Sequence, residues 1–453
     1  MHTLYTLCKE NCWKMLLLSN RNILKKQLEW QYGDQFKSTV TLMNYQKFTQ
    51  LLKFKSFDKG SYQVIVSDEA HFFFQDAPYN NESDITLNYL SEKTDSLVLF
   101  LSATCSAIYK YLEDKWNFSY QFLKPYKFAK YFYWNNIDVI KKFLINLPEN
   151  EKAIYFCRNI DTAYSLHKEM PECSSFICSQ NNAKYASKSN TETLKQITER
   201  EMFDCKILFT TTVLDNGINL HDPFLKHIII DLYDFDAIIQ CIGRRRIDDE
   251  VNLPNIYIAQ YTQSHLQSII NTYSRVLEPI TSLTNEGLEL FERKYNRKNL
   301  HGLLYTESTD GQFTQYKVNK AKEYRYRYEI KLAQAINQQD TKFGHLKYLC
   351  ELLSLDFAEF QDLSKYYTAI TLNDKLDSYI GKRLFGTDKT RFVELLKKNV
   401  LTPLVGGYKV NTVNNYFDNI QLPYVVKDQK VRERKSPYYN KRYWLLQEKM
   451  RPE

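Results

Sequence analysis

The sequence predicts an α/β protein with two lobes, each built on a parallel sheet, followed by a mainly helical region. Short apolar runs alternate with amphipathic stretches through about the first 260 residues, which is the rhythm of parallel α/β units. The segment Phe118–Trp134 interrupts this rhythm with aromatics, lysines and Pro125, so we expect it to connect two lobes. After about Ser264 the rhythm ends, and we expect domains at 1–125, 126–263 and 264–453.

The individual elements follow from local patterns. Eight short apolar runs bounded by polar residues are predicted to be buried strands: Met15–Ser19, Tyr62–Ser67, Leu97–Ser102, Ala153–Cys157, Ser175–Cys178, Lys206–Thr210, His227–Asp231 and Asn255–Ala259. Helices with polar residues at their starts are predicted at Ile23–Trp30, Thr162–Glu169 and Thr191–Glu201. In the last region, helices are expected around Leu332–Ile336, His345–Leu353 and Thr390–Lys398, beside Tyr/Lys/Arg-rich segments at Lys320–Tyr328 and Lys430–Tyr443.

The composition narrows the class of protein. Hydrophobic residues make up 43% and charged residues 25% of the chain, an ordinary globular balance. No apolar run is long enough to span a membrane, and the N-terminal run is too short for a convincing signal peptide, so we expect a cytoplasmic protein without a membrane partner. The nine cysteines include no CxxC pair and predict reduced, mostly buried thiols rather than a zinc site. The net charge of +8 favours a polyanionic partner only mildly.

An acidic strand end is the first candidate for chemistry. The apolar run Val64–Val66 leads into Ser-Asp-Glu-Ala-His, which places Asp68, Glu69 and His71 together. Two adjacent carboxylates at the carboxyl edge of a parallel sheet lie where α/β proteins hold ligands. Asp68 can hold Mg²⁺ through its water shell, and Glu69 can polarise a water for attack on a γ-phosphate. A short acidic motif can equally do no more than solvate a strand end, so both interpretations stay open here.

A second apolar run ends in two hydroxyls, in the sequence Ser102-Ala103-Thr104. By itself this sequence is an ordinary helix cap. Since it follows the Asp-Glu-Ala-His strand by one helix, it resembles the Ser-Ala-Thr motif that superfamily 2 helicases of the DEAD/DEAH-box type place beside their DEAH box. The resemblance implies that Ser102 and Thr104 couple hydrolysis to movement, and that His71 belongs to the catalytic set with Asp68 and Glu69.

The end of the run Lys206–Thr210 extends the resemblance into the second lobe. A hydroxyl cluster and a Gly turn follow the strand and resemble the fifth motif of this family. The resemblance implies that Thr211 contacts the nucleic-acid backbone and that Gly217 approaches the nucleotide. Asn219 takes a nucleotide-binding position where an aspartate is common. A strand-to-helix turn or a hairpin would explain the same pattern without a ligand.

The segment Gln240–Arg246 reads Gln-Cys-Ile-Gly-Arg-Arg-Arg and resembles the sixth motif, Gln-x-x-Gly-Arg-x-x-Arg. Adjacent guanidinium groups repel one another, so a polyphosphate partner would compensate them. The resemblance implies that Gln240, Arg244 and Arg246 are catalytic, that Arg244 also binds nucleotide, and that an arginine finger crosses the interlobe cleft. The last arginine stands one place early, so the choice between Arg245 and Arg246 as the finger stays open.

Three weaker segments fit the same order. The run Leu16–Arg21 with Gln27 resembles motif Ia, which implies that Arg21 and Gln27 hold strand phosphates. The segment Val40–Gln46 resembles the backbone-contacting segment before the DEAH strand, with Tyr45 as a contact. Ala153–Arg158 resembles motif IV, with Arg158 as a contact. Each alone would be an ordinary core strand with a polar end, and their common order carries the resemblance.

Taken together, the motifs imply two RecA-like lobes that hydrolyse ATP between them. The cofactors implied are ATP and Mg²⁺, with the metal held by Asp68 through the nucleotide. The partner implied is a nucleic acid, and we expect DNA rather than RNA.

One part of the family pattern is missing from the sequence. The family binds ATP with a loop of the form Gly-x-x-x-x-Gly-Lys-Ser/Thr, and none of the 12 glycines belongs to such a loop. In the family the loop lies one helix before motif Ia, and His2–Lys14 would be that helix. We therefore expect a truncated gene product, a misassigned start codon, or one half of a split protein whose separate N-terminal fragment carries the loop. Lobe 1 would then lack a central strand and have an open sheet edge.

Two other classes of protein compete with an active motor. A two-lobed nucleic-acid clamp that no longer turns over ATP would account for the missing loop. A nuclease would need a further carboxylate cluster, and the acidic run Asp248–Glu250 is better explained as pairing with the arginines before it. In the last region, Lys430–Trp444 interleaves cations with aromatics, which suits single strands, although a solvated basic tail is the simpler explanation.

Overall fold

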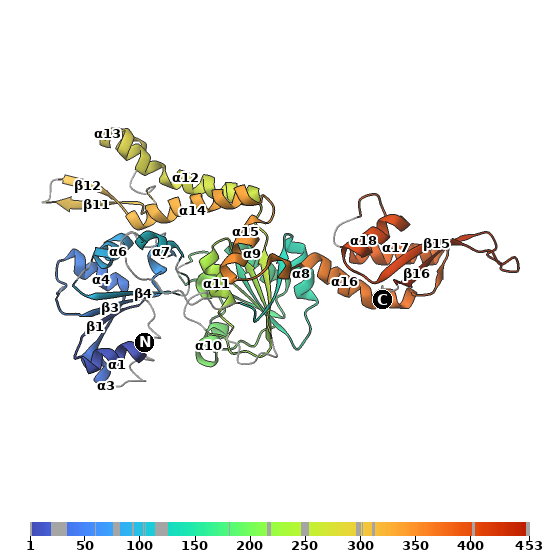
Figure 1. The fold of residues 1–453 in the computed structure, drawn as a ribbon, viewed down its shortest axis with the longest axis horizontal. Helices are drawn as coiled ribbons and strands as arrows, with labels where there is room; N and C mark the ends of the chain where they lie inside the picture. The colour runs from blue at the N-terminus through green and yellow to red at the C-terminus, as the bar shows by residue number, and fades with distance from the viewer. Residues whose placement is uncertain are drawn as a thin grey trace.

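The computed structural model describes residues 2–19, 34–58, 60–75, 82–92, 95–102, 104, 106–113, 126–180, 182–214, 219–245, 253–295, 300, 302–309, 313–400 and 404–449. Two α/β lobes lie side by side, a layer of long helices lies across them, and a separate module lies at the far end beyond lobe 2 (Figure 1). The predicted fold class, two parallel-sheet lobes, is confirmed. The predicted helix Ile23–Trp30 lies outside the described residues.

Lobe 1 is a parallel sheet of order β2-β1-β3-β4. Its strands are β1 (Met15–Leu18), β2 (Val40–Met43), β3 (Val64–Asp68) and β4 (Leu97–Leu101), and its helices are α1 (His2–Glu10), α3 (Asp34–Thr39), α4 (Tyr45–Lys53), α5 (Phe72–Gln75), α6 (Ser83–Glu92) and α7 (Ser106–Leu112). Successive residues of β1 pack into two different cores, one on each face, which explains why β1 reads as an unbroken apolar run.

One edge of the lobe 1 sheet agrees with the open edge expected from the sequence. β4 pairs with β3 and with no other strand that the structure describes. Leu97 and Leu101, at its two ends, are 49% and 36% exposed, which is unusual for leucines in a strand of an α/β sheet.

Lobe 2 is a parallel sheet of order β13-β5-β10-β9-β6-β8-β7. Its strands are β5 (Lys130–Trp134), β6 (Lys152–Cys157), β7 (Ser174–Ile177), β8 (Ile207–Thr210), β9 (Leu225–Asp231), β10 (Asn255–Ala259) and β13 (Phe360–Asp362). Its helical elements are α8 (Ile137–Ile145), α9 (Ile160–Glu169), η1 (Ala186–Lys188), α10 (Thr191–Arg200), η2 (Thr212–Leu214) and α11 (Phe235–Ile242). The eight predicted strands of the two lobes are all present, within two residues at each end. The connection between the lobes was predicted to extend to Trp134, and this end was wrong, because Lys130–Trp134 forms strand β5 inside the lobe 2 sheet.

The region after 263 is not one unit, which corrects the third predicted domain. It begins with α12 (Gln263–Asn285), α13 (Leu288–Lys294), the hairpin β11 (Leu304–Thr309) and β12 (Phe313–Val318), α14 (Lys320–Gln339), α15 (Gly344–Leu353) and η4 (Phe357–Glu359). α12 and α14 run side by side along the top of both lobes (Figure 1). α15 and β13 join the core and the sheet of lobe 2, so lobe 2 is completed by residues about 100 positions beyond its predicted end.

The last part of the chain forms a module with its own apolar core. It contains α16 (Leu363–Leu376), η5 (Asp377–Tyr379), β14 (Arg383–Leu384), α17 (Gly386–Asn399), α18 (Val410–Asn419), β15 (Tyr424–Lys430) and β16 (Arg442–Glu448), with an antiparallel sheet of order β14-β16-β15. The expectation of a basic tail on a mainly helical region is therefore corrected, because Lys430–Tyr443 is the tip of the β15–β16 hairpin and part of β16.

Three negative findings apply to the described residues. Their eight cysteines form no disulfide. They contain no group of His, Cys, Asp and Glu side chains that would hold a metal ion. Among them, no helix combines the length and the apolar character needed to cross a membrane.

Candidate functional site between the two lobes

The acidic strand end lies at the carboxyl edge of lobe 1. After Asp68 the chain turns sharply, because Glu69 has a φ of +52°, a left-handed conformation that non-glycine residues seldom adopt. The turn is held by a hydrogen bond of 2.8 Å from the Ala70 amide to the Leu101 carbonyl of the neighbouring strand. Ser19 Oγ donates to Asp68 Oδ2 at 3.2 Å. The two carboxylates are thus fixed at the edge where parallel strands end.

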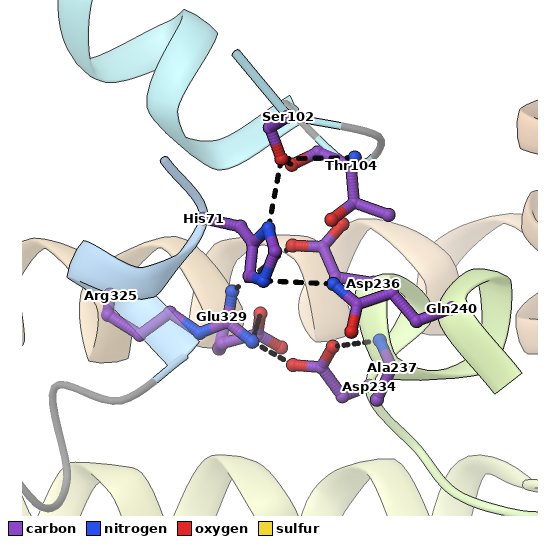
Figure 2. Close-up of polar contacts among 9 residues, drawn as sticks. All are labelled: His71, Ser102, Thr104, Asp234, Asp236, Ala237, Gln240, Arg325 and Glu329. Carbon is purple, nitrogen blue, oxygen red and sulfur yellow. Dashed lines mark hydrogen bonds and ion pairs between the residues drawn. The ribbon is translucent and has the colours of Figure 1, made fainter. Parts of the chain in front are cut away.

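His71 is the centre of a polar network that joins both lobes (Figure 2). Its Nδ1 lies 3.0 Å from Ser102 Oγ and 3.2 Å from Glu69 Oε2, and its Nε2 lies 3.0 Å from Gln240 Nε2 of lobe 2. The imidazole and the amide are each only 5% exposed. The acidic strand end, the Ser-Ala-Thr segment and the arginine segment therefore meet at one place, although 169 residues separate His71 from Gln240.

The hydrogen bonds around His71 define its tautomer. Ser102 Oγ donates its proton to the Thr104 carbonyl at 2.6 Å and accepts from the Thr104 amide at 3.2 Å. Because that hydroxyl proton is already used, His71 Nδ1–H must be the donor toward Ser102. Nε2 then carries a lone pair, which accepts from the Gln240 amide group. His71 therefore contacts lobe 1 through Nδ1 and lobe 2 through Nε2.

The arginine segment follows α11 directly. Arg244 is half-buried, and its Nε donates to the Gln240 carbonyl at 3.2 Å, which keeps Arg244 beside the His71 contact. The Arg244 carbonyl accepts from the Leu220 amide at 2.8 Å, so the segment after half-buried Asn219 is tied to the arginines. Asn219 and Arg244 are therefore brought to the same side of lobe 2.

The choice between Arg245 and Arg246 as the finger is narrowed by burial. Arg245 is only 7% exposed. Burial lowers the pKa of His227, and the nearby cations Lys226 and Arg245 lower it further. Arg246 and Gly217 lie outside the described residues.

The predicted nucleic-acid contacts divide into three groups. The prediction that Tyr45 contacts nucleic acid was wrong, because its side chain is only 1% exposed. The Tyr45 hydroxyl lies 2.7 Å from both Ser67 Oγ and the Asp68 carbonyl, so it supports the acidic strand end from inside the core. Arg158 and Thr211 lie just after β6 and β8, at the carboxyl edge, with Arg158 exposed and Thr211 half-buried. Arg21 and Gln27 lie outside the described residues.

A buried charge cluster beside the site was missed by the sequence analysis (Figure 2). Arg325 of α14 forms an ion pair with Asp234 and lies 3.0 Å from Glu329 Oε1 and 3.9 Å from Asp236 Oδ2. Asp234 also caps α11 by accepting from the Ala237 amide at 2.9 Å. The spacing of Arg325 and Glu329 at i and i+4 suggests a pair within one helix, but no local signal points to partners 91 residues away.

Burial and repulsion among the acids change the protonation of this cluster. The pKa of Asp236 is raised to about 6. Burial contributes most to this rise and Asp234 adds to it, while Arg325 and His71 oppose it. Burial likewise raises the pKa of Glu329 to about 7. Asp236 of lobe 2 therefore lies close enough to His71 of lobe 1 for the two side chains to interact across the junction of the lobes.

α14 also packs against lobe 1. The ring of Tyr324 lies 5.5 Å from that of Phe74 and 4.9 Å from that of Tyr111, and Lys110 Nζ lies 5.7 Å from the ring centroid of Tyr328. One helix therefore contacts lobe 1 through its tyrosines and lobe 2 through Arg325, directly behind the His71–Gln240 contact.

Comparison with known proteins identifies part of this arrangement. Residues 135–247 match the family described as the helicase conserved C-terminal domain. Lobe 2 carries a helicase C-terminal domain. This match agrees with the resemblance to helicases expected from the motifs of lobe 2. The helicase C-terminal domain supplies Gln240 and Arg244 to the site, and Arg158 and Thr211 also lie within it.

Several solved helicase structures are similar to the chain in fold. S. cerevisiae Dbp5 bound to RNA and ADP BeF3 is 17% identical over 54% of this chain and 70% of its own, with a TM-score of 0.39. A DEAD box protein from Methanococcus jannaschii is 15% identical over 55% and 74%, with a TM-score of 0.31. Mycobacterium smegmatis helicase Lhr bound to ssDNA and AMP-PNP is 11% identical over 58% and 36%, with a TM-score of 0.36. No curated protein matches the sequence.

Proposed function

We propose that this chain is the motor of an ATP-dependent nucleic-acid helicase or translocase of the DEAD/DEAH-box type, with ATP hydrolysed between the two lobes. The observation that carries the proposal is the 3.0 Å contact between His71 and Gln240, which joins the acidic strand end to the helicase C-terminal domain. Such a contact brings a carboxylate pair and an arginine to the same cleft, which is what transfer of a γ-phosphoryl group to water requires.

Each residue has a role in this proposal. Asp68 holds Mg²⁺ through the nucleotide, which would neutralise charge on the phosphates, and Glu69 orients the attacking water. Arg244 and Arg246 stabilise the γ-phosphate, and Asn219 and Gly217 approach the nucleotide. Ser102 and Thr104 transmit the state of His71 to lobe 1. Two buried polar atoms without a described partner, Gln240 Oε1 and Thr104 Oγ1, fit a site that completes its hydrogen bonds when the nucleotide binds.

The phosphate-binding loop must come from residues other than these 453, because the sequence contains no such loop. We propose that the segment that carries the loop, joined to this chain or on a separate one, adds a parallel strand to β4. The exposed leucines at the ends of β4 and its single described neighbour support that position.

The nucleic-acid contacts proposed are Arg158 and Thr211, with Arg21 and Gln27 from lobe 1. Arg158 and Thr211 follow strands β6 and β8 at the carboxyl edge of the lobe 2 sheet, where a nucleic-acid strand can cross from one lobe to the other. The preference for DNA over RNA stays a prediction, and binding assays with strands of both kinds test it. A cytoplasmic location also stays a prediction.

The test is Glu69→Gln in a preparation that includes the loop-bearing segment. We expect nucleic-acid-stimulated ATP hydrolysis to fall by at least about 100-fold, because the water loses its orienting carboxylate, while nucleic-acid affinity changes less than about 3-fold. Retained turnover would refute the assignment of Glu69.

The second candidate is a nucleic-acid clamp that does not turn over ATP. The missing phosphate loop favours it. Nucleic-acid binding without any ATP hydrolysis, even when the loop-bearing segment is supplied, would establish the clamp and exclude the motor.

A further inference from the structure

The β15–β16 hairpin carries a concentration of positive charge at the end of the molecule. Residues 427–442 contain seven lysines and arginines and two acidic residues. Their excess of positive charge is more than half of the +8 of the whole chain, in 16 positions. Figure 1 shows the hairpin extending away from the C-terminal module, on the side opposite lobe 1. A charge excess placed on a projecting ribbon is available to a partner.

Both acidic residues of the hairpin are already paired. Asp428 accepts from Arg442 at 3.0 Å, and Glu433 accepts from Arg383 at 2.9 Å. Of the six remaining cations, Lys441 lies over the ring of Tyr438. The other five are all exposed and form no ion pair with a described residue: Lys427, Lys430, Arg432, Arg434 and Lys435. Five unpaired cations on one ribbon repel one another, and the repulsion is relieved when a polyanion binds.

The tip of the hairpin has a defined shape. The Val431 amide donates to the Lys441 carbonyl and the Asn440 amide donates to the Val431 carbonyl, both at 3.0 Å. Val431 is only 3% exposed, so the base of the tip is packed. The cations of the tip are therefore presented by an ordered loop, which lowers the entropy lost on binding.

The aromatic residues of the hairpin argue against single-strand stacking as its main use. The Tyr438 ring already stacks on Phe385, with centroids 4.5 Å apart, and Lys441 Nζ lies 5.5 Å from its centroid. Tyr443 is 7% exposed and packs against the same Phe385. Tyr438 and Tyr439 are each 46% exposed, but a single strand would need a row of free rings, and Tyr438 and Tyr443 are already packed against Phe385.

The shape and charge fit a duplex. A two-stranded ribbon has the width of a nucleic-acid groove, and a duplex carries about one phosphate charge per 1.7 Å of its axis. An open groove next to the hairpin, lined by Lys382, Arg383 and Arg391, extends the basic surface, with Asp388 as an acidic member. Arg383 connects this groove to the hairpin, because it lines the groove and pairs with Glu433 of the hairpin.

We infer that the β15–β16 hairpin is a binding site for the phosphate backbone of duplex nucleic acid, separate from the strand path across the lobes. The inference rests on the proposed nucleic-acid partner. It gives the C-terminal module a role: it holds the duplex while the two lobes act on a strand.

The test compares a triple variant, Arg432→Gln with Arg434→Gln and Lys435→Gln, with a control of equal charge loss. The control variant is Lys142→Gln with Lys195→Gln and Lys331→Gln, all exposed and far from the hairpin in sequence. Binding of the full chain to a short blunt duplex and to one of its strands is measured by fluorescence anisotropy over a range of KCl concentrations.

We expect the hairpin variant to lose at least about 10-fold in duplex affinity at low salt. The slope of log K against log[salt] should become less negative by about 2 to 3, because about 0.9 counterion is released for each phosphate contact and three cations are removed. The control and the single strand should each change less than about 3-fold. Unchanged duplex affinity, an equal loss in the control, or an equal loss with the single strand would overturn the inference. If the unaltered chain bound neither probe, the proposed nucleic-acid partner itself would fail.

Discussion

Replacing Arg325 by methionine tests whether α14 holds the two lobes in the arrangement that brings His71 to Gln240. The substitution removes the guanidinium that Asp234, Asp236 and Glu329 share, and leaves most of the apolar stem in place. The side chains of Arg325, Asp236 and Glu329 are 10%, 13% and 6% exposed, so water cannot replace the lost cation. The acids would remain as uncompensated buried groups.

The magnitude follows from this burial. Breaking a buried ion pair by removing one partner costs about 3–5 kcal/mol. For a cooperative unit of about 150–250 residues, each kcal/mol lowers the melting temperature by about 2–4 °C, so a fall of about 6–20 °C is expected. Adding Asp236→Asn and Glu329→Gln to Arg325→Met should recover most of the loss, because Asp234, the acid that remains, is 29% exposed and still accepts from the Ala237 amide.

Thermal unfolding followed by circular dichroism measures this difference. The control is Arg327→Met on the same helix, because Arg327 is 53% exposed and pairs with Glu323 at the surface. Such a surface pair contributes less than about 1 kcal/mol. Equal melting temperatures for the two variants would refute the reasoning that the Arg325 cluster holds the junction of the lobes.

Two further predictions concern protonation and the corrected tyrosine. The pKa of Glu329 is raised in the fold from its ordinary 4.5 to about 7, so the contribution of protonated Glu329 to stability is fully present below about pH 4.5 and is lost as the pH rises through about 7. The melting temperature should therefore fall between about pH 5 and pH 8 by more in the unaltered chain than in Glu329→Gln, and identical pH profiles would contradict the assignment. Tyr45→Phe should lower the free energy of unfolding by about 1–2 kcal/mol, since the Asp68 carbonyl loses a buried donor, and should leave nucleic-acid affinity within about 2-fold. A large loss of affinity without a loss of stability would restore Tyr45 as a nucleic-acid contact.

The sequence predicts the part of the fold that depends on local patterns. β3 is an apolar run that ends in charge, and strands that end this way in a parallel sheet must present their charges at one edge. The order of the motifs then predicts that the arginine segment faces the acidic strand end, and in the structure Gln240 and His71, which belong to these two segments, are in contact. The strand positions in both lobes follow for the same local reason.

Features that depend on distant pairing were not predictable in this way. β5, with the sequence Lys-Tyr-Phe-Tyr-Trp, stands in an aromatic and basic stretch and becomes a strand because it pairs with β10 and β13. β13 has three residues and joins the sheet from 230 positions further along the chain than β5, which no local period reveals. In the sequence, Arg325 cannot be distinguished from the other cations of a Tyr/Lys/Arg-rich helix. Its role depends on Asp234 and Asp236, which only the fold brings to it.

The central claim is that the acidic strand end of lobe 1 and the arginine segment of lobe 2 face each other across one cleft. A double-mutant cycle of His71→Ala and Gln240→Ala, measured by urea unfolding of the chain, tests it most directly. The account predicts a coupling energy of about 0.5–3 kcal/mol, because the two side chains are hydrogen-bonded and buried. Effects that add within about 0.3–0.5 kcal/mol would show that the two residues do not meet, and would contradict the account.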